Sequence, residues 1–446
     1  MTLYLLERAW LGHRFADDVL VEVEDGRFTS VTPDSDPPRA IPVRGLVVPG
    51  LANTHSHAFH RALRGRTQRE RGTFWTWRDQ MYAVAARLDP DTYLALARAT
   101  YREMAAAGIT CVGEFHYVHH RPDGSSYADP NEMGEVLVEA ARQAGIRITL
   151  LDTLYLSSGF GVPPEGAQLR YSDGSVGAWA DRVDALAAST DAAGPATAHA
   201  VTGMAVHSVR AVPAADLSSV AARLDGRPFH VHLSEQVAEN TACLDAYGVT
   251  PARLLADHGL LGPTSSLVHA THLTDDDIDL IGAAGAHASF CPTTERDLGD
   301  GIGPSRRLHD AGARLTLGSD SHAVIDLFEE MRAVELDERL ATQQRGHWSA
   351  TELLTAATTD GHASLGWDDA GAIAVGGRAD LVVVDPASPR TAGTGRDEGA
   401  VVFAATAEDV QRVMVDGQWV VEEGQRYDIG LELEAAVARI WGEDPR

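Results

Sequence analysis

Short apolar segments alternate with helix-length segments through most of this chain, and this alternation strongly constrains its fold. Eight such segments lie between residues 46 and 321, and seven of them follow a helical or helix-length stretch. Repeated strand-then-helix units favour a parallel sheet, because parallel strands need long crossover connections. Eight units predict an α/β fold of the (β/α)8 TIM-barrel type. The alternative is a flat doubly wound sheet, which is disfavoured because no GxGxxG or GxxxxGK[ST] motif follows the first segment.

The two ends of the chain differ from the middle. Residues 1–49 contain alternating sequences such as VLVEVE and the turn PDSDPP, and residues 369–446 contain a hairpin signal at Asp416-Gly417. We expect both ends to form one small β-sandwich domain. Residues 50–368 then form the barrel domain.

Charge and composition exclude several partners. The formal net charge of -27 at pH 7 opposes binding to nucleic acids and anionic membranes, because both require a basic surface. We find no basic leader before an apolar core and no apolar run near the roughly 20 residues of a membrane span, so we expect a cytoplasmic protein. The three cysteines show no CxxC spacing. Any metal ion must therefore be held by histidines and carboxylates.

Two histidine pairs lie at the ends of predicted strands. His55 and His57, in LANTHSHAFHR, are two residues apart, so on an extended backbone their imidazoles point to one side and can share a cation. His230 and His232, in HVHLSEQ, alternate in the same way. Each pair taken alone could equally be structural. His60 breaks the period, and we expect it to lie beyond the first strand as a substrate contact rather than a ligand.

Three further polar residues follow later strands. Glu235 is three residues beyond His232, where the strand should give way to a loop that directs the side chain toward a pocket. On the sixth strand the alternation places His269 on the pocket side and His272 on the other, although twist or a bulge could exchange them. Asp320, in GSDSH, follows the apolar sequence ARLTLG, where an unpaired carboxylate would be costly.

The combined pattern of HxH on the first strand, histidines on the fifth and sixth, and aspartate on the eighth resembles the amidohydrolase superfamily. No lysine stands at the end of the fourth strand to bridge two metals, and HSVRAV offers His207 and Arg210 instead. This absence, together with His-x-x-Glu, resembles the mononuclear deaminase branch. The resemblance narrows to the formimidoylglutamate deiminase family, iminohydrolases of histidine degradation, on the segments GTFWTWRDQMY, GEFHYVHH, HSVRAV, HVHLSEQ, CPTTERDLGDG and GSDSH.

The resemblance implies one divalent metal ion held by His55, His57, His232 and Asp320. Zinc suits nitrogen and oxygen ligands, although iron or manganese could occupy the same set. Such an ion lowers the pKa of a bound water from about 15.7 to about 7. We assign Asp320 a second role as acceptor of the water's proton, His269 the orientation of that water, and Glu235 the delivery of a proton to the nitrogen that leaves.

The implied reaction converts N-formimidoyl-L-glutamate to N-formyl-L-glutamate and ammonia. Substrate contacts are expected at His60, Arg78, Tyr117, His207 and Arg210. The two arginines are the local cations that a small dicarboxylate needs against the charge of -27. Arg78 could instead belong to the surface of an amphipathic helix. The family commonly has glutamine where His60 stands. The resemblance to this family also implies a homodimer.

Two other functions stay open. A deaminase of an aromatic base or nucleoside would use the same metal residues without needing Arg78 and Arg210 to face the metal. Such deaminases usually carry a Ser-Asn type sequence where this chain has Thr294-Glu295. An inactive metal-binding paralogue acting as an assembly protein is the alternative of another class, although every proton-transfer position is present. We assign no role to the remaining histidines near strand ends, which are His116, His119, His120 and His322.

Overall fold

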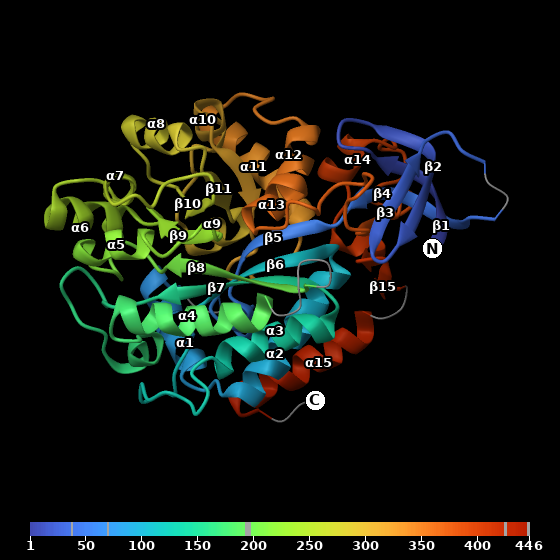
Figure 1. Cartoon of the computed structure of the whole chain (residues 1–446). Coiled ribbons are helices and arrows are strands. Elements are labelled where there is room, and N and C mark those ends of the chain that lie inside the picture. Colours follow the sequence, from blue (N-terminus) through green and yellow to red (C-terminus); the bar gives the residue numbers. More distant parts are fainter. Residues whose placement is uncertain (37–38, 69–70, 192–197, 423–425, 444–446) are drawn as a thin grey trace.

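A computed structural model describes residues 1–36, 39–68, 71–191, 198–422 and 426–443 (Figure 1). Its larger sheet has eight strands that pair in parallel in their sequence order. A parallel bridge between Ser56 and Asp320 joins the first strand to the end of the last, so the sheet nearly closes. The predicted barrel is confirmed. Its strands are β5 (Leu51–Ser56), β6 (Ile109–His116), β7 (Arg147–Leu154), β8 (Ala200–Val206), β9 (Phe229–Leu233), β10 (Ser265–His269), β11 (His287–Phe290) and β12 (Arg314–Leu317).

Helices cover the outside of the barrel, and the strands between them are almost entirely buried. Burial on both faces explains why the strands read as nearly continuous apolar runs. The helices that follow or flank the strands are α2 (Pro90–Ala106), α3 (Glu132–Ala144), α4 (Val176–Asp191), α5 (Ala214–Ala221), α6 (Val237–Tyr247), α7 (Pro251–Asp257), α8 (Asp275–Ala283), α10 (Ser305–Ala311), α11 (Leu327–Thr342), α12 (Ala350–Ala357) and α13 (Thr359–Ser364). None of the helices in the described ranges is long and apolar enough to cross a membrane.

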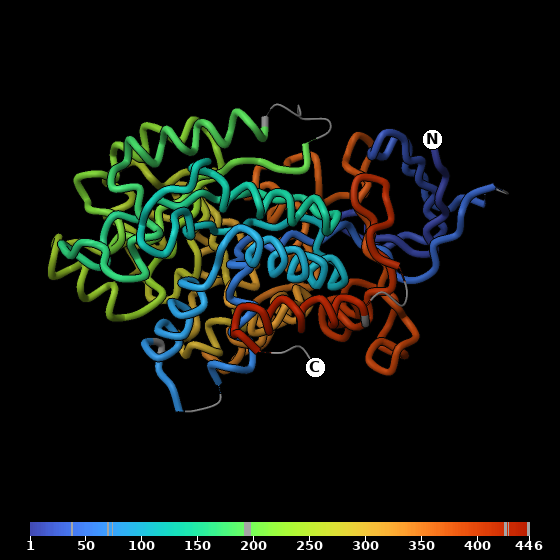
Figure 2. The backbone as a smooth tube through the Cα atoms, turned by 90° about the horizontal axis from the view of Figure 1, so that it is seen from below, coloured from blue at the N-terminus to red at the C-terminus, as the bar shows by residue number. Residues whose placement is uncertain are grey.

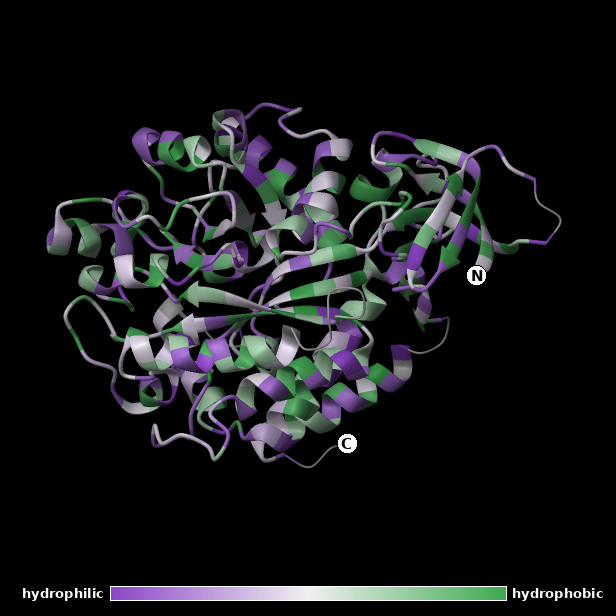
Figure 3. Ribbon diagram, in the orientation of Figure 1, coloured by the Kyte–Doolittle hydropathy of each residue, from purple (hydrophilic) through white to green (hydrophobic). Residues whose placement is uncertain are grey.

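Local sequence explains where these helices begin. Asp89 caps α2 by accepting a hydrogen bond from the backbone N–H of Thr92, and Pro90 occupies the first helical position. Hydrophobic and hydrophilic residues alternate along α2 (Figure 3). Its apolar face, which includes Tyr93, Leu96 and Tyr101, is buried against the barrel.

The second sheet combines both ends of the chain, as the sequence predicts. Its seven strands are ordered β15-β14-β13-β4-β1-β2-β3. They are β1 (Thr2–Trp10), β2 (Phe15–Glu24), β3 (Arg27–Thr32), β4 (Ile41–Pro49), β13 (Leu381–Val384), β14 (Val410–Val415) and β15 (Gln418–Val421). The sheet curls, so that the turn at Gly26 approaches the turn at Gly417. Ala379 lies between them: its N–H donates to the carbonyl oxygen of Gly26, and its carbonyl oxygen accepts from the N–H of Gly417. Residues from both ends, including Leu6 and Leu381, therefore share one apolar cluster.

Gly50 separates this sheet from the barrel. A Cβ atom at Gly50 would lie 2.2 Å from Oγ1 of Thr110, so a glycine is needed where β4 ends and β5 begins. The predicted division of 1–49 with 369–446 from 50–368 stays a prediction. Near the end of the chain, α15 (Arg426–Trp441) packs on α2 of the barrel, and both views place the two helices side by side (Figures 1 and 2).

Four short elements complete the regions around the barrel ends and the second sheet. They are α1 (Phe74–Ala85), α9 (Pro292–Leu298), α14 (Glu398–Phe403) and the 3-10 helix η3 (Ala407–Asp409). Two more 3-10 helices, η1 (Ala58–Leu63) and η2 (Gly166–Tyr171), follow β5 and β7. The segment between Ser157 and Ser175 therefore contains one short helix.

Candidate active site

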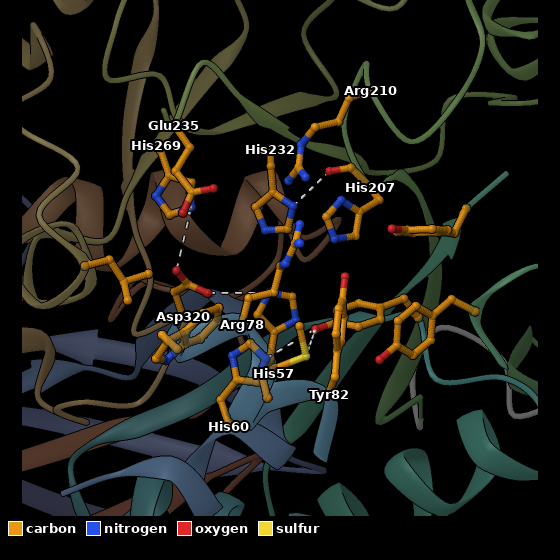
Figure 4. A pocket seen from close by; sticks show the side chains of 16 residues that line it. His57, His60, Arg78, Tyr82, His207, Arg210, His232, Glu235, His269 and Asp320 are labelled. Atoms are coloured by element: carbon orange, nitrogen blue, oxygen red, sulfur yellow. Dashed lines mark hydrogen bonds and ion pairs between the residues drawn. The ribbon is translucent and has the colours of Figure 1, made fainter. Parts of the chain in front are cut away.

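A cavity opens where the barrel strands end at their carboxyl ends, the usual place for a barrel active site (Figure 4). Every residue that the sequence nominates for the site lines it, apart from His55, which is fully buried behind it. The lining residues are His57, His60, Trp77, Arg78, Met81, Tyr82, Tyr117, Tyr155, Tyr171, His207, Arg210, His232, Glu235, His269, Leu298 and Asp320.

Four of the nominated side chains form a compact group that could hold a metal ion. Ligand atoms of His55, His57, His232 and Asp320 all lie within 4.8 Å of one another. Nε2 of His55 is 3.0 Å from Nε2 of His232. Oδ1 of Asp320 is 3.6 Å from Nε2 of His55 and 3.4 Å from Nε2 of His57. The group joins residues at the ends of β5, β9 and β12.

Backbone carbonyls orient two of these histidines. Nδ1 of His57 donates to the carbonyl oxygen of Phe115 at 2.9 Å, and Nδ1 of His232 donates to that of His207 at 2.8 Å. Because a carbonyl only accepts, each Nδ1 carries the hydrogen and each Nε2 turns a lone pair toward the group. Burial lowers the pKa of His55, His57 and His232 well below the ordinary value, so they are neutral. Three neutral imidazoles and a carboxylate fit a divalent cation.

A second group lies beside the first. Nε2 of His269 is 3.6 Å from Oδ2 of Asp320 and 3.9 Å from Oε1 of Glu235 (Figure 4). Burial opposes a charge on His269, but the carboxylates of Glu235, Glu295 and Asp320 outweigh it and raise the pKa of His269 to about 10. Burial, reinforced by Glu235 and Glu295, raises the pKa of Asp320 to about 7. Negative charge is crowded here, as suits a site that takes a cation.

Uncommon backbone conformations aim these side chains. Ser234, directly after β9, has a φ of 51°, and the chain turns there so that Glu235 faces the cavity. His269, the last residue of β10, has a φ of 70°, and Asp320 has a φ of 41°. Residues other than glycine rarely adopt positive φ, and functional sites collect such strain. His272, in contrast, hydrogen-bonds to the carbonyl oxygen of Asp300 through its Nε2 at 2.8 Å and does not line the cavity.

Two arginines enter the same cavity from different elements. Arg210 follows β8, and its guanidinium makes no hydrogen bond or ion pair to any residue that the structure describes. Arg78 lies on α1, with its Cζ 4.4 Å from the ring centroid of Trp75 and 5.5 Å from that of Tyr82. Stacking on two aromatic rings holds the Arg78 guanidinium in place at the cavity wall. A pocket that holds two such cations suits an anionic ligand.

The other nominated substrate contacts also meet here. His60 lies in η1, and its Nε2 is 3.2 Å from the hydroxyl oxygen of Tyr117. His207 follows β8. Burial lowers the pKa of both His60 and His207 to about 3, with Arg210 adding to the effect at His207. Both imidazoles are therefore neutral hydrogen-bonding groups. His60 stands outside the four-residue metal group.

Sequence reasoning missed an aromatic wall made by Tyr82, Tyr155 and Tyr171. Gln168 joins two of these rings, because its Nε2 donates to the hydroxyl of Tyr82 at 3.1 Å and to that of Tyr155 at 3.0 Å. Tyr82 is four residues after Arg78 on one helix face, and Tyr155 directly follows β7, so helical spacing and the strand-end rule could have found both. Tyr171 lies in η2, where no sequence period identifies it.

A further histidine group lies away from the cavity. Ligand atoms of His116, His119 and Asp152 are also close together. Both carboxylate oxygens of Asp152, however, accept hydrogen bonds from Arg182 at 2.5 Å and 2.8 Å, and Trp179 donates to one of them at 3.0 Å. Both oxygens of Asp152 are thus already used in a buried, hydrogen-bonded ion pair with Arg182. We therefore interpret this group as structural.

Comparison with known proteins supports the interpretation of the cavity. The model of the "Amidohydrolase family" matches residues 46–420. Formimidoylglutamate deiminase of Pseudomonas aeruginosa is 38% identical, and the match covers 99% of each chain. The predicted resemblance is confirmed.

More distant relatives extend this comparison. A 5-methylthioadenosine/S-adenosylhomocysteine deaminase of Natronomonas pharaonis is 29% identical over 91% of this chain and 88% of that protein. The crystal structure of an amidohydrolase from Brucella melitensis superposes with a TM-score of 0.91 at 31% identity, covering 99% of this chain and 100% of that one. The fold of this chain is therefore shared with related proteins along nearly its whole length.

Proposed function

This chain belongs to the amidohydrolase family, and from that premise we propose that it hydrolyses N-formimidoyl-L-glutamate to N-formyl-L-glutamate and ammonia. The reaction would be a step of histidine degradation. The similarity to a formimidoylglutamate deiminase along nearly the whole chain supports this choice of substrate. The homodimer and the cytoplasmic location stay predictions.

The observation that carries the proposal is the pair of arginines in the cavity. Arg78 and Arg210 line the same space as His57, His232 and Asp320. In a chain with a formal net charge of -27, a dicarboxylate needs such local cations to bind. Arginine also matches a carboxylate through two parallel hydrogen bonds. An uncharged base would offer no carboxylate to either guanidinium group.

We propose that His55, His57, His232 and Asp320 hold one divalent ion, and that it is zinc. The donor set of neutral imidazoles and one carboxylate suits zinc. When bound, the ion supplies Lewis acidity and lowers the pKa of water at the site. Iron or manganese in the purified protein would change the identity of the ion without changing the residues that bind it.

The remaining groups move protons. Asp320 accepts a proton from water, whose oxygen forms a bond to the amidine carbon, and Nε2 of His269 orients that water. Glu235 delivers a proton to the terminal nitrogen, and the proton held by Asp320 then passes to the same nitrogen. The C–N bond breaks and ammonia leaves, while the hydroxyl proton of the tetrahedral intermediate returns to Glu235 as the formyl C=O forms. The products are formylglutamate and ammonia, which balance one substrate and one water. The distance of 3.9 Å from Glu235 to His269 lets both groups act on one reacting centre.

A nucleoside deaminase is the second candidate, and the aromatic wall favours it because aromatic rings stack on bases. The wall of Tyr82, Tyr155 and Tyr171 borders the cavity, and the relative from Natronomonas pharaonis is named for nucleoside deamination. Arg210, which makes no hydrogen bond or ion pair within the described part of the chain, favours the dicarboxylate instead. Direct assays separate the two candidates.

The decisive experiment incubates the zinc-loaded protein with N-formimidoyl-L-glutamate and measures ammonia and formylglutamate. We expect both in equal amounts, and no ammonia from adenosine. Arg210→Met should raise KM at least about tenfold, because a charge-assisted hydrogen bond contributes about 1.5–3 kcal/mol. Arg307→Met, at an exposed ion pair with Asp275, is the matched control and should leave KM unchanged. Formamide and glutamate as products would overturn the proposal, since another bond would have been cleaved.

A further inference from the structure

Glu295 is a buried carboxylate of α9 that the proposed proton transfers do not use. Its side chain is 5% exposed. Oε1 of Glu295 accepts a hydrogen bond from the backbone N–H of Cys291 at 2.8 Å. The same oxygen lies 3.3 Å from Nδ1 of His269. One carboxylate oxygen thus joins the start of α9 to the end of β10.

These contacts determine which nitrogen of His269 faces the reaction. Oε1 already accepts the N–H of Cys291, so it is an acceptor, and Nδ1 of His269 must donate its hydrogen to it. The ring is then held with Nε2 directed at Oδ2 of Asp320, 3.6 Å away, and at Oε1 of Glu235, 3.9 Å away. A carboxylate at the far nitrogen of a histidine fixes the orientation of its ring.

We propose that Glu295 is a positioning residue that acts on the reaction by holding the ring of His269. The inference rests on the role of His269 in the proposed function. Glu295 does not line the cavity and is not one of the four residues of the metal group. Its charge reaches Asp320 through space, whereas its hydrogen bond is made to His269. Its position on α9, anchored by Cys291, gives the imidazole a rigid support that the strained end of β10 does not provide by itself.

Substitution of Glu295 by methionine removes the acceptor and keeps the length of the side chain. We expect kcat to fall about 10- to 100-fold, the range typical of partners that orient active-site histidines, while KM and bound zinc stay unchanged. Glu295→Gln keeps an oxygen acceptor and should restore most of the loss. Glu295→Asp, which withdraws the oxygen by one methylene group, replaces the methionine variant if that variant does not fold.

Glu338 provides the matched control. It is also buried, and its Oε1 accepts the backbone N–H of Arg306 at 2.8 Å near the start of α10, with no contact to the cavity. Glu338→Met should lower the melting temperature as Glu295→Met does, but leave kcat unchanged. An equal loss of kcat in both variants would overturn the proposal, because it would reflect general destabilisation.

A double-mutant cycle tests whether the effect passes through His269. In a His269→Asn background, Glu295→Met should cause no further loss of kcat, because the residue that it positions is already absent. A further loss of the same factor would overturn the proposal. Nitrogen NMR of the 15N-histidine-labelled protein gives a readout without substrate. The Nδ1–H signal that disappears in His269→Asn should shift in Glu295→Met, and an unchanged signal would contradict the inference even if the substrate were different.

Discussion

At the scale of single residues, the histidines of this chain differ in what lies at each ring nitrogen. His57 and His232 each donate from Nδ1 to a carbonyl oxygen and turn Nε2 toward the metal group. His269 has carboxylates near both nitrogens. The strand period predicts which side chains share a face, but the partners that distinguish a metal ligand from a proton-transfer group come from remote parts of the chain.

Glu235→Gln tests this division of roles. The variant should keep its zinc, because Glu235 lies outside the metal group, while turnover falls at least about 100-fold through loss of the proton donor. Zinc content and the rate of ammonia release measure the two effects. Asp320→Asn is the contrasting control and should lose both zinc and turnover. Unchanged turnover in Glu235→Gln would contradict its assigned role.

At the scale of elements, the sequence predicts the strands well because burial on both faces leaves long apolar runs. It also predicts the polar residues at the ends of β5, β9, β10 and β12. It does not predict the conformation of Ser234, because a positive φ at serine leaves no mark in composition or period. It also misses α15, whose packing on α2 depends on contacts between distant parts of the chain.

The junction of β5 and β12 supports a prediction about metal affinity. A Cβ atom at Gly318 would lie 2.7 Å from Cβ of His55 and 2.9 Å from Sγ of Cys291. Gly318→Ala must therefore displace β5 or β12, and we expect zinc affinity to fall at least about tenfold, since orienting contacts at metal sites have effects of this size. Competition with a zinc-binding dye measures the zinc affinity of each variant. Gly262→Ala, in open space, is the control. Equal affinities in both variants would show that the junction tolerates a methyl group.

At the scale of the whole molecule, the barrel and the second sheet are tied together through both ends of the chain. β4 and β13 lie next to each other in one sheet although they are more than 300 residues apart, and α15 returns to the barrel beside α2. Within the barrel, the proposed metal ligands come from the ends of the first, fifth and eighth strands. A bound ion thus connects parts of the barrel that are distant in sequence.

Removal of the ion should therefore lower the stability of the whole chain. A ligand that binds only the folded state stabilises it by about 4.1 kcal/mol at a thousand times its Kd, so chelation should lower the melting temperature by several degrees. Calorimetry at one scan rate, before and after chelation, measures the change, and added zinc should restore it. Asp320→Asn, which lacks the carboxylate ligand, should show little response to the chelator. Equal melting temperatures of the wild-type protein with and without chelator would contradict a structural contribution of the metal, and the ligands would then serve the reaction alone.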